Sequence, residues 1–284
     1  MNLNRFAILP SLLAVALMAA CTPGTGADGK SSASKGGHQE TASKLVADAS
    51  KGSMKLDKLM EKDARDGLVP GVVSPASQSG TPQIVWFSKG LQYIIPSEPL
   101  DSTGTGINKD LLVKAGILMA PDKVSDAIAN EGFIVGKSGP VVTAFVDPNC
   151  GYCNMFYTKI MPLVDAGKLR VRFVMVAFLR PSSEAISANI LADSNPAAAL
   201  KRDESDFKKR SGSKDEKIPE IKNPAMVEKV KANTAMWHSI GGNGTPTLAF
   251  CETGKEITVK DGMPQDLDGL IASLDKAPKD KACK

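Results

Sequence analysis

FVDPNCGYC, residues 145–153, is the most informative segment of this chain. It joins the end of an apolar run, 140–146, to a helical pattern that extends from residue 150 to about 164. A second apolar run follows at 171–179, and both runs are rich in Val and Phe, which is typical of strands buried on both faces. Two such strands joined by a helix should lie parallel, so this region predicts an α/β unit.

The segment ends in a Cys-x-x-Cys pair with Gly151 and Tyr152 between the two cysteines. The first cysteine, Cys150, falls at the predicted helix N-terminus, where free backbone N–H groups and the helix dipole stabilise a thiolate. Cys153 lies one turn later on the same side of the helix. We therefore predict that Cys150 is a nucleophile toward disulfides and that Cys153 resolves the mixed disulfide formed on it.

A structural disulfide and a zinc site are the alternatives for this pair. A bridge between cysteines three residues apart is possible, although it is rarely placed between a strand and a helix. Zinc needs four ligands, but Cys251 and Cys283 lack a paired spacing and His38 and His238 stand alone. The redox interpretation requires neither a metal nor a cofactor.

Thr245 and Pro246 directly precede another strand-like run, 247–252. Proline there costs a ladder hydrogen bond and needs a local reason. A cis Thr245–Pro246 bond is cheap compared with any other cis peptide and would turn backbone groups toward a substrate strand. The alternative is an ordinary trans proline that ends the preceding loop.

Two further cysteines lie near the C-terminus. Cys251 falls on the strand after Pro246, and Cys283 follows the last predicted helix. Because an exported protein favours paired cysteines, we predict a bridge between them; two free thiols are the alternative. The stretch 182–240 before that strand is largely helical, and its charged run 208–217 is interpreted as a solvated face.

The N-terminal half predicts a smaller unit. Residues 44–67 have a weakly amphipathic helical pattern, and the runs 84–88 and 91–95 suggest a hairpin. So small a unit buries little by itself, so we expect it to complete its core against a partner. A helical stretch, 108–130, follows and is interrupted at Gly116 and Pro121.

The chain begins with an export signal at 1–20, in which Arg5 precedes an apolar run too short to span a bilayer. The small residues before Cys21 resemble a bacterial lipobox, which predicts a lipid on Cys21; simple cleavage is the alternative. Thr22, by resemblance to bacterial lipoproteins, favours the outer membrane. The Gly- and Ser-rich residues after it predict a flexible tether. A net charge of +4, spread along the chain, gives no footprint for nucleic acid.

The order of these features is that of the thioredoxin fold, and the chain resembles the DsbC/DsbG family of periplasmic disulfide isomerases. The resemblance is strongest at FVDPNCGYC, at FLRPSSEAISANILAD and at GNGTPTLAF. The last two segments are more similar to DsbG, whereas the Gly151-Tyr152 dipeptide is more similar to DsbC. The resemblance implies a V-shaped homodimer joined through the N-terminal units, and a DsbD-like membrane reductase that keeps the cysteine pair reduced.

The predicted fold is therefore an α/β thioredoxin-fold catalytic domain with a helical insertion, preceded by a small α+β dimerisation domain and a linker helix. The predicted parts are a signal peptide (1–20), a tether (21–43), an N-terminal dimerisation domain (44–107), a linker helix (108–132) and a catalytic domain (133–284) with its insertion at about 182–240.

The predicted function is isomerase or reductase activity on exported proteins with wrong disulfides. An oxidase with the same motif, a chaperone that uses the dimer cleft, and a lipid-tethered envelope assembly factor are the alternatives.

Overall fold

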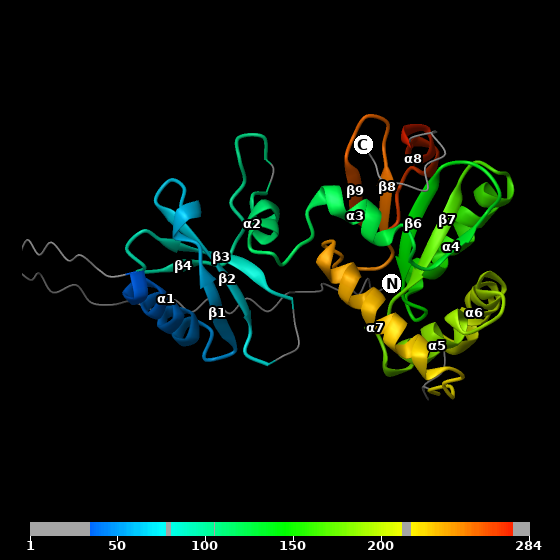
Figure 1. The fold of residues 1–284 in the computed structure, drawn as a ribbon, viewed down its shortest axis with the longest axis horizontal. Helices are drawn as coiled ribbons and strands as arrows, with labels where there is room; N and C mark the ends of the chain where they lie inside the picture. The colour runs from blue at the N-terminus through cyan, green and yellow to red at the C-terminus, as the bar shows by residue number, and fades with distance from the viewer. Residues whose placement is uncertain (1–34, 78–80, 105, 212–216, 275–284) are drawn as a thin grey trace, which may run out of the picture.

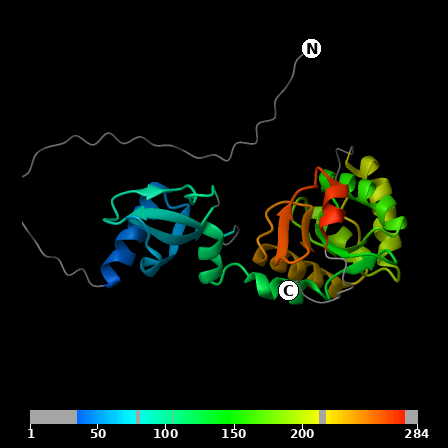
Figure 2. The same cartoon turned by 90° about the horizontal axis from the view of Figure 1, so that it is seen from above.

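The computed structural model describes residues 35–77, 81–104, 106–211 and 217–274. These residues form two units, each built on its own sheet (Figures 1 and 2). The sheet of the N-terminal unit has the order β1-β2-β3-β4, and that of the C-terminal unit has the order β5-β7-β6-β8-β9. No helix within these ranges combines the length and the hydropathy that a membrane span requires.

The N-terminal unit is an antiparallel sheet with a helix on each face. Its elements are α1 (Lys35–Ala49), β1 (Met54–Leu59), the short 3₁₀ helix η1 (Glu61–Asp63), β2 (Leu68–Pro75), β3 (Gln83–Ser88) and β4 (Ile94–Ile95). Ala42 and Val46 of α1 are buried with Phe87 on one face. On the other face Trp86 packs with Leu111 of α2 (Asn108–Lys114), and the Trp86 indole donates to Asn108 Oδ1 at 2.9 Å.

The structure corrects the predicted boundaries in this unit. The helix begins at Lys35, so residues 35–43 belong to α1 and not to a tether. It ends at Ala49, because Lys51 and Gly52 adopt positive φ angles that stop a helix. The residues after this turn form β1 and β2, two strands that the helical interpretation of 44–67 missed. The predicted signal peptide and Cys21 lie outside the described residues.

The connection between the two units is interrupted where the sequence indicates. Helix α2 ends at Lys114, Gly116 has a φ of +75°, and α3 (Pro121–Ile128) begins with proline at its first position, where a missing N–H costs nothing. Val124 and Ile128 of α3 pack in a cluster that contains Trp237. The break therefore separates a helix of the first unit from a helix of the second.

The C-terminal unit has a mixed sheet flanked by helices. Its further elements are β5 (Phe133–Val135), β6 (Val141–Val146), α4 (Gly151–Asp165), β7 (Arg170–Met175), α5 (Pro181–Leu191), α6 (Pro196–Ser211), α7 (Pro224–Ser239), β8 (Thr247–Cys251), β9 (Ile257–Asp261) and α8 (Leu267–Ser273). Strands β6 and β7 are parallel, as predicted, and the other pairs are antiparallel. Helices α5, α6 and α7 enter the chain between β7 and β8 and gather below the sheet in Figure 1.

The core of this unit fixes the position of α4. Phe156, Ile160 and Val164 on one face of the helix are buried against the sheet. The central strands contribute apolar side chains on both faces, as their composition predicts. Strand β7 ends at Met175, four residues earlier than the apolar run. The N-terminus of α4 thus lies at the carboxyl end of β6, and the buried face of α4 fixes it there.

Candidate active site

The two cysteines of the motif lie at the first turn of α4. Cys150 has extended backbone angles (φ −88°, ψ 116°) and is the residue that caps the helix, while Cys153 N–H donates to the Cys150 carbonyl at 3.1 Å. Both are free thiols. Their exposure differs: Cys150 retains 7% of its surface and Cys153 retains 1%. The Cys150 thiol donates to the Thr245 carbonyl at 3.1 Å.

The surroundings lower the pKa of one thiol and raise that of the other. The pKa of Cys150 falls from 9.0 to about 6, chiefly because the Cys153 thiol hydrogen-bonds to it. Burial opposes this shift, whereas the Thr245 hydroxyl and the backbone N–H groups of Cys153 and Tyr152 support it. Burial, reinforced by Cys150, raises the pKa of Cys153 well above its usual value. At neutral pH the first sulfur is therefore an anion and the second a thiol.

The Thr245 hydroxyl is suited to this role. It is buried and has no hydrogen-bond partner in the part of the chain that the structure describes, so it is available to a sulfur anion. The Thr245–Pro246 peptide is cis, which confirms the prediction and rules out the trans alternative. Behind it, the Thr247 hydroxyl accepts from the Trp237 indole and donates to Asp261, each at 2.6 Å. This chain of bonds ties the proline loop to α7 and β9.

Asp147 anchors the loop before the cysteines. It is fully buried, and its carboxylate accepts from the backbone N–H groups of Asn149, Phe178 and Leu179 at 2.8, 2.9 and 3.1 Å. It also accepts from the Ser183 hydroxyl at 2.8 Å. The first bond lies within this loop, and the other three join it to α5 and to the loop before α5. The two bonds from Phe178 and Leu179 also explain why the apolar run 171–179 leaves the sheet early.

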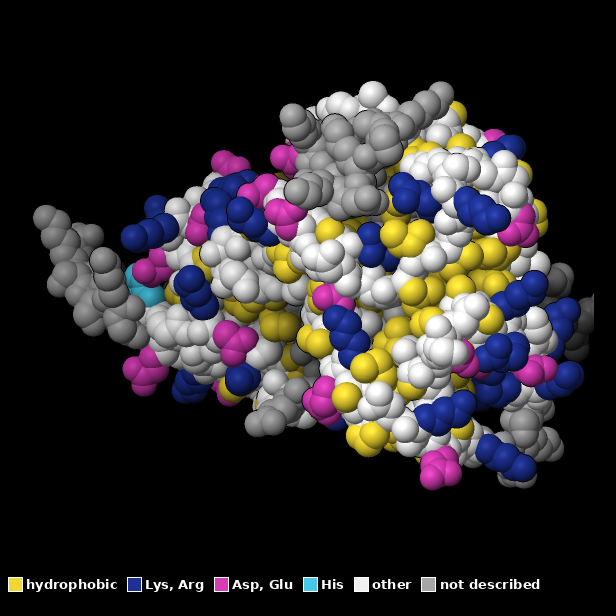
Figure 3. Space-filling model, turned by 45° about the vertical axis from the view of Figure 1, so that its right-hand side comes forward, with side chains coloured by type: hydrophobic (Ala, Val, Ile, Leu, Met, Phe, Trp, Pro, Cys, Tyr) yellow, Lys and Arg dark blue, Asp and Glu magenta, His cyan; other side chains and the backbone are white. Residues whose placement is uncertain are grey.

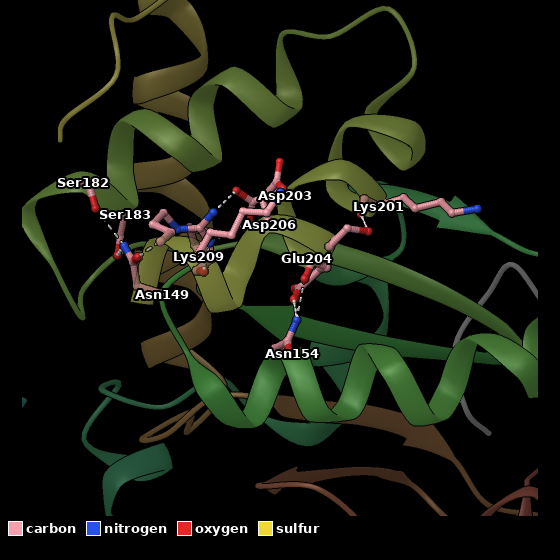
Figure 4. A network of polar contacts seen from close by, with 12 residues as sticks. Asn149, Asn154, Ser182, Ser183, Lys201, Asp203, Glu204, Asp206 and Lys209 are labelled. Atoms are coloured by element: carbon pink, nitrogen blue, oxygen red, sulfur yellow. Dashed lines mark hydrogen bonds and ion pairs between the residues drawn. The ribbon is translucent and has the colours of Figure 1, made fainter. Parts of the chain in front are cut away.

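The helical insertion contributes a polar network that the sequence did not indicate (Figure 4). Arg210 pairs with Asp203 at 2.6 Å and donates to the Pro148 carbonyl at 2.6 Å, just before the cysteines. The Asn154 amide, one residue after Cys153, donates to the Glu204 carboxylate at 2.7 Å and to the Glu204 carbonyl at 2.8 Å. Arg210 falls in the charged run that we interpreted as a solvated face, and for this residue that interpretation is wrong.

Apolar side chains remain exposed on the motif, on α4 and on the loop before α5. Tyr152 of the motif is 67% exposed, and Met155, Phe178 and Leu179 are also exposed. Phe178 stacks on Trp237 with ring centroids 4.6 Å apart. Figure 3 shows further hydrophobic surface on the face of the C-terminal unit that it presents, interrupted by Lys and Arg side chains. Gly151 leaves space at the helix start, since a Cβ there would meet only the Phe207 ring, at 3.9 Å.

The remaining predicted residues have separate positions. Cys251 lies at the end of β8 and is disulfide-bonded, which excludes a free thiol there. Its predicted partner, Cys283, lies outside the described residues, so this pairing stays a prediction. Within the described residues no three His, Cys, Asp or Glu side chains are grouped as metal ligands would be.

This five-stranded sheet, with a cysteine pair at a helix N-terminus beside a cis-proline loop, defines a thioredoxin-like thiol:disulfide oxidoreductase. The family model described as a thioredoxin-like domain matches residues 134–277, which confirms the predicted fold. The Pseudomonas aeruginosa thiol:disulfide interchange protein DsbG is 38% identical over 207 residues, which is 72% of this chain and 78% of the relative. The chain belongs to the DsbC/DsbG-type thiol:disulfide interchange proteins.

Two more distant proteins of the same name are also similar. The Escherichia coli K12 thiol:disulfide interchange protein DsbG is 28% identical over 129 residues, which is 45% of this chain and 50% of the relative. The solved structure of Helicobacter pylori DsbG is 16% identical with a TM-score of 0.34, and the match covers 74% of this chain and 99% of that one.

Proposed function

We propose that this chain is an exported disulfide isomerase and reductase, with Cys150 as nucleophile and Cys153 as resolving thiol. The observation that supports this most is the difference between the two thiols: the pKa of Cys150 is lowered to about 6 and that of Cys153 is raised. An enzyme that opens wrong disulfides needs one sulfur that is ionised before substrate arrives and a second that reacts only after the first is occupied.

In the proposed cycle the Cys150 thiolate attacks one sulfur of a substrate disulfide. A new S–S bond forms to Cys150, the substrate S–S bond breaks, and the released substrate sulfur leaves as a thiolate. In isomerisation another substrate thiolate attacks the mixed disulfide and regenerates the Cys150 thiolate. In reduction Cys153 loses its proton and attacks Cys150, which releases the second substrate thiolate and leaves the enzyme disulfide.

Thr245 and Pro246 are proposed to hold the substrate backbone beside Cys150. The contact between the Cys150 sulfur and the Thr245 carbonyl places this loop next to the reacting atom. Gly151 and Tyr152 separate the two sulfurs, and Tyr152 offers an exposed ring to the substrate. Because backbone contacts carry little sequence information, we expect broad specificity toward misoxidised proteins.

The partners and the location belong to the same proposal. A homodimer joined through the N-terminal units would place two such sites across one cleft, and a DsbD-like membrane reductase would return the enzyme disulfide to the dithiol. The export signal places the chain in the periplasm, where a lipid on Cys21 would tether it to the outer membrane. The family resemblance and the sequence at 1–21 support these statements.

An oxidase is the second candidate, and one observation favours it. A lowered thiolate pKa stabilises the reduced form and so makes the enzyme disulfide more oxidising. The reduction potential and the oligomeric state separate the two functions. A monomer that is isolated oxidised, and that transfers its disulfide to a reduced substrate faster than it rearranges scrambled ones, would be an oxidase.

The test is recovery of activity by a ribonuclease with scrambled disulfides. The reduced full chain should restore activity, and Cys150→Ala should abolish the effect. Cys153→Ala should instead accumulate a mixed disulfide with the substrate, visible by mass. Lys159→Ala, an exposed change on α4, is the matched control and should behave as the unchanged chain. Full activity of Cys150→Ala would overturn the proposal and favour a chaperone or an assembly factor.

A further inference from the structure

Glu204 of the helical insertion is a buried carboxyl close to the dithiol, and the exchange chemistry described above leaves it without a role. It retains 7% of its surface. Its carboxylate accepts a hydrogen bond from the Asn154 amide at 2.7 Å, and the same amide also binds the Glu204 carbonyl at 2.8 Å. Asn154 follows Cys153 directly on α4, so this carboxyl is held against the helix that carries both sulfurs (Figure 4).

No cation pairs directly with Glu204 among the described residues. The nearby guanidinium of Arg210 binds Asp203 at 2.6 Å, whereas the hydrogen-bond partner of Glu204 is a neutral amide. Burial of a carboxylate without a salt bridge is costly, and protonation is the usual escape. The pKa of Glu204 accordingly rises from 4.5 to about 7, with burial as the main cause and Asp203 and the charge of Cys150 as further ones.

The ionisable groups around Glu204 can be assigned from each packed element. Helix α4 contributes Cys150 and Tyr157, and the pKa of Tyr157 is itself raised by burial and by the charge of Glu204. Helix α5 packs on α6 and carries one ionisable residue, Glu184, which is not among the groups that shift the pKa of Glu204. Strand β5 has only Phe, Ile and Val. On α6 itself lie Asp203 and Arg210 and the exposed groups Lys201, Arg202, Asp206, Lys208 and Lys209.

The interaction with Cys150 must act in both directions, because coupling between two sites is reciprocal. A thiolate at Cys150 favours a proton on Glu204. When the sulfur becomes part of a disulfide its charge disappears, and the carboxyl releases that proton more readily.

We propose that Glu204 is a positioning residue for the dithiol: it takes up a proton when Cys150 becomes an anion and releases it when Cys150 enters a disulfide. The inference rests on the proposed function and deepens it. It reduces the difference in net charge between the reduced and the oxidised site, since part of the negative charge moves between Glu204 and Cys150.

The reaction balances with a dithiol as reductant. The reductant gives two electrons and two protons and becomes a disulfide, while the Cys150–Cys153 bond breaks. One proton goes to the Cys153 sulfur and the other is divided between the Glu204 carboxylate and water, so Cys150 remains a thiolate. Below the pH at which Glu204 ionises in the oxidised enzyme, the second proton is released to water instead.

The test is the redox equilibrium of the full chain with glutathione, measured from about pH 5 to about pH 8. Glu204→Gln removes the ionisable group and keeps an amide of similar shape. At the lowest pH the variant and the unchanged chain should agree. At the highest pH the variant should be more easily reduced, by roughly threefold to tenfold in the equilibrium constant, which corresponds to half to one pKa unit of coupling. Asp206→Asn, an exposed change two residues away, should match the unchanged chain throughout. Equal curves for Glu204→Gln and the unchanged chain would overturn the inference.

A second measurement covers the case in which Glu204→Gln does not fold. The Glu204 carboxyl is titrated by NMR in the glutamate-labelled full chain, reduced, with Cys150 present or replaced in Cys150→Ser. Loss of the thiolate should lower the Glu204 pKa, while the other glutamates serve as internal controls. An unchanged Glu204 pKa would overturn the inference. Neither measurement needs a substrate protein, so failure on scrambled ribonuclease would reject the proposed function and leave this coupling measurable.

Discussion

Replacing Cys153 by alanine should raise the pKa of Cys150. The Cys153 thiol is the largest of the contributions that lower this pKa from 9.0 to about 6. A hydrogen bond to a charged acceptor is worth about 1.5 to 3 kcal/mol, and one pKa unit corresponds to about 1.4 kcal/mol. The loss is therefore about one to two pKa units. The backbone N–H groups and the Thr245 hydroxyl remain, so the pKa should stop short of 9.0.

The assay is the rate of alkylation by iodoacetamide as a function of pH, followed by intact mass. The midpoint of the curve is the readout, because a more basic thiolate is also more nucleophilic and the absolute rate mixes both effects. In the unchanged chain Cys150 reacts first, since Cys153 is 1% exposed and its pKa is raised. Cys153→Ser keeps a hydrogen-bond donor at the same place, so the midpoint of its alkylation curve should stay at about pH 6. A Cys153→Ala midpoint equal to that of the unchanged chain would refute the reasoning, as would equal shifts for Ala and Ser.

Three other changes test the stability of the C-terminal unit. Because the pKa of Glu204 is higher in the folded chain (about 7) than its ordinary value of 4.5, the free energy of unfolding should fall as pH rises between these values. Glu204→Gln should remove this fall, which is up to roughly 3 kcal/mol. Urea unfolding at about pH 5 and about pH 8 measures it. The same change in the free energy of unfolding with pH in both chains would contradict the prediction. Asp147→Ala should cost at least about 3 kcal/mol, because it leaves several buried donors without an acceptor. A urea midpoint equal to that of the unchanged chain would count against the anchoring role. Cys251→Ser and Cys283→Ser should each destabilise by about 3 to 4 kcal/mol, and the double variant by no more; a larger additive loss in thermal unfolding would exclude their pairing.

The α4 region was predictable because its signals are local. The strand before Asp147, the turn residues after it and the helical face with Phe156 and Ile160 all lie within about one turn or strand of each other in the sequence. Such patterns depend on burial and on backbone geometry that neighbouring residues determine. The cis Thr245–Pro246 peptide has a different basis. A proline directly before a strand is by itself compatible with a trans peptide, and only the order of the surrounding elements, which resembles the thioredoxin fold, favours the cis form that the structure shows.

The N-terminal strands could not be predicted in this way. β2 contains Pro70, and proline within a run argues against a central strand. The structure accommodates Pro70 because the pairing of β1 with β2 ends at Leu59, opposite Gly71. The ladder between these two strands therefore does not need the N–H that Pro70 lacks. β1 has polar residues at its exposed positions, and its spacing also fits a weak helix. Only the packing of α1 on this sheet separates the two possibilities.

The polar network of the insertion was missed for a different reason. Glu204 and Arg210 lie about 50 to 60 residues from the atoms they contact, and their surroundings in the sequence are charged on both sides. A run of this kind is most often solvated, and nothing local distinguishes the two side chains that turn inward. Long-range contacts of α6 with α4 decide their burial.

The unequal burial of the two thiols also bears on how the protein survives oxidants. Peroxide that reaches Cys150 converts it to a sulfenic acid, and a second equivalent would carry it to the irreversible sulfinic acid. Cys153 is shielded and lies one turn away, so its sulfur can condense with the sulfenic acid and expel water. Accidental damage at the Cys150 sulfur is thereby turned into the same internal disulfide that a dithiol reductant can reopen.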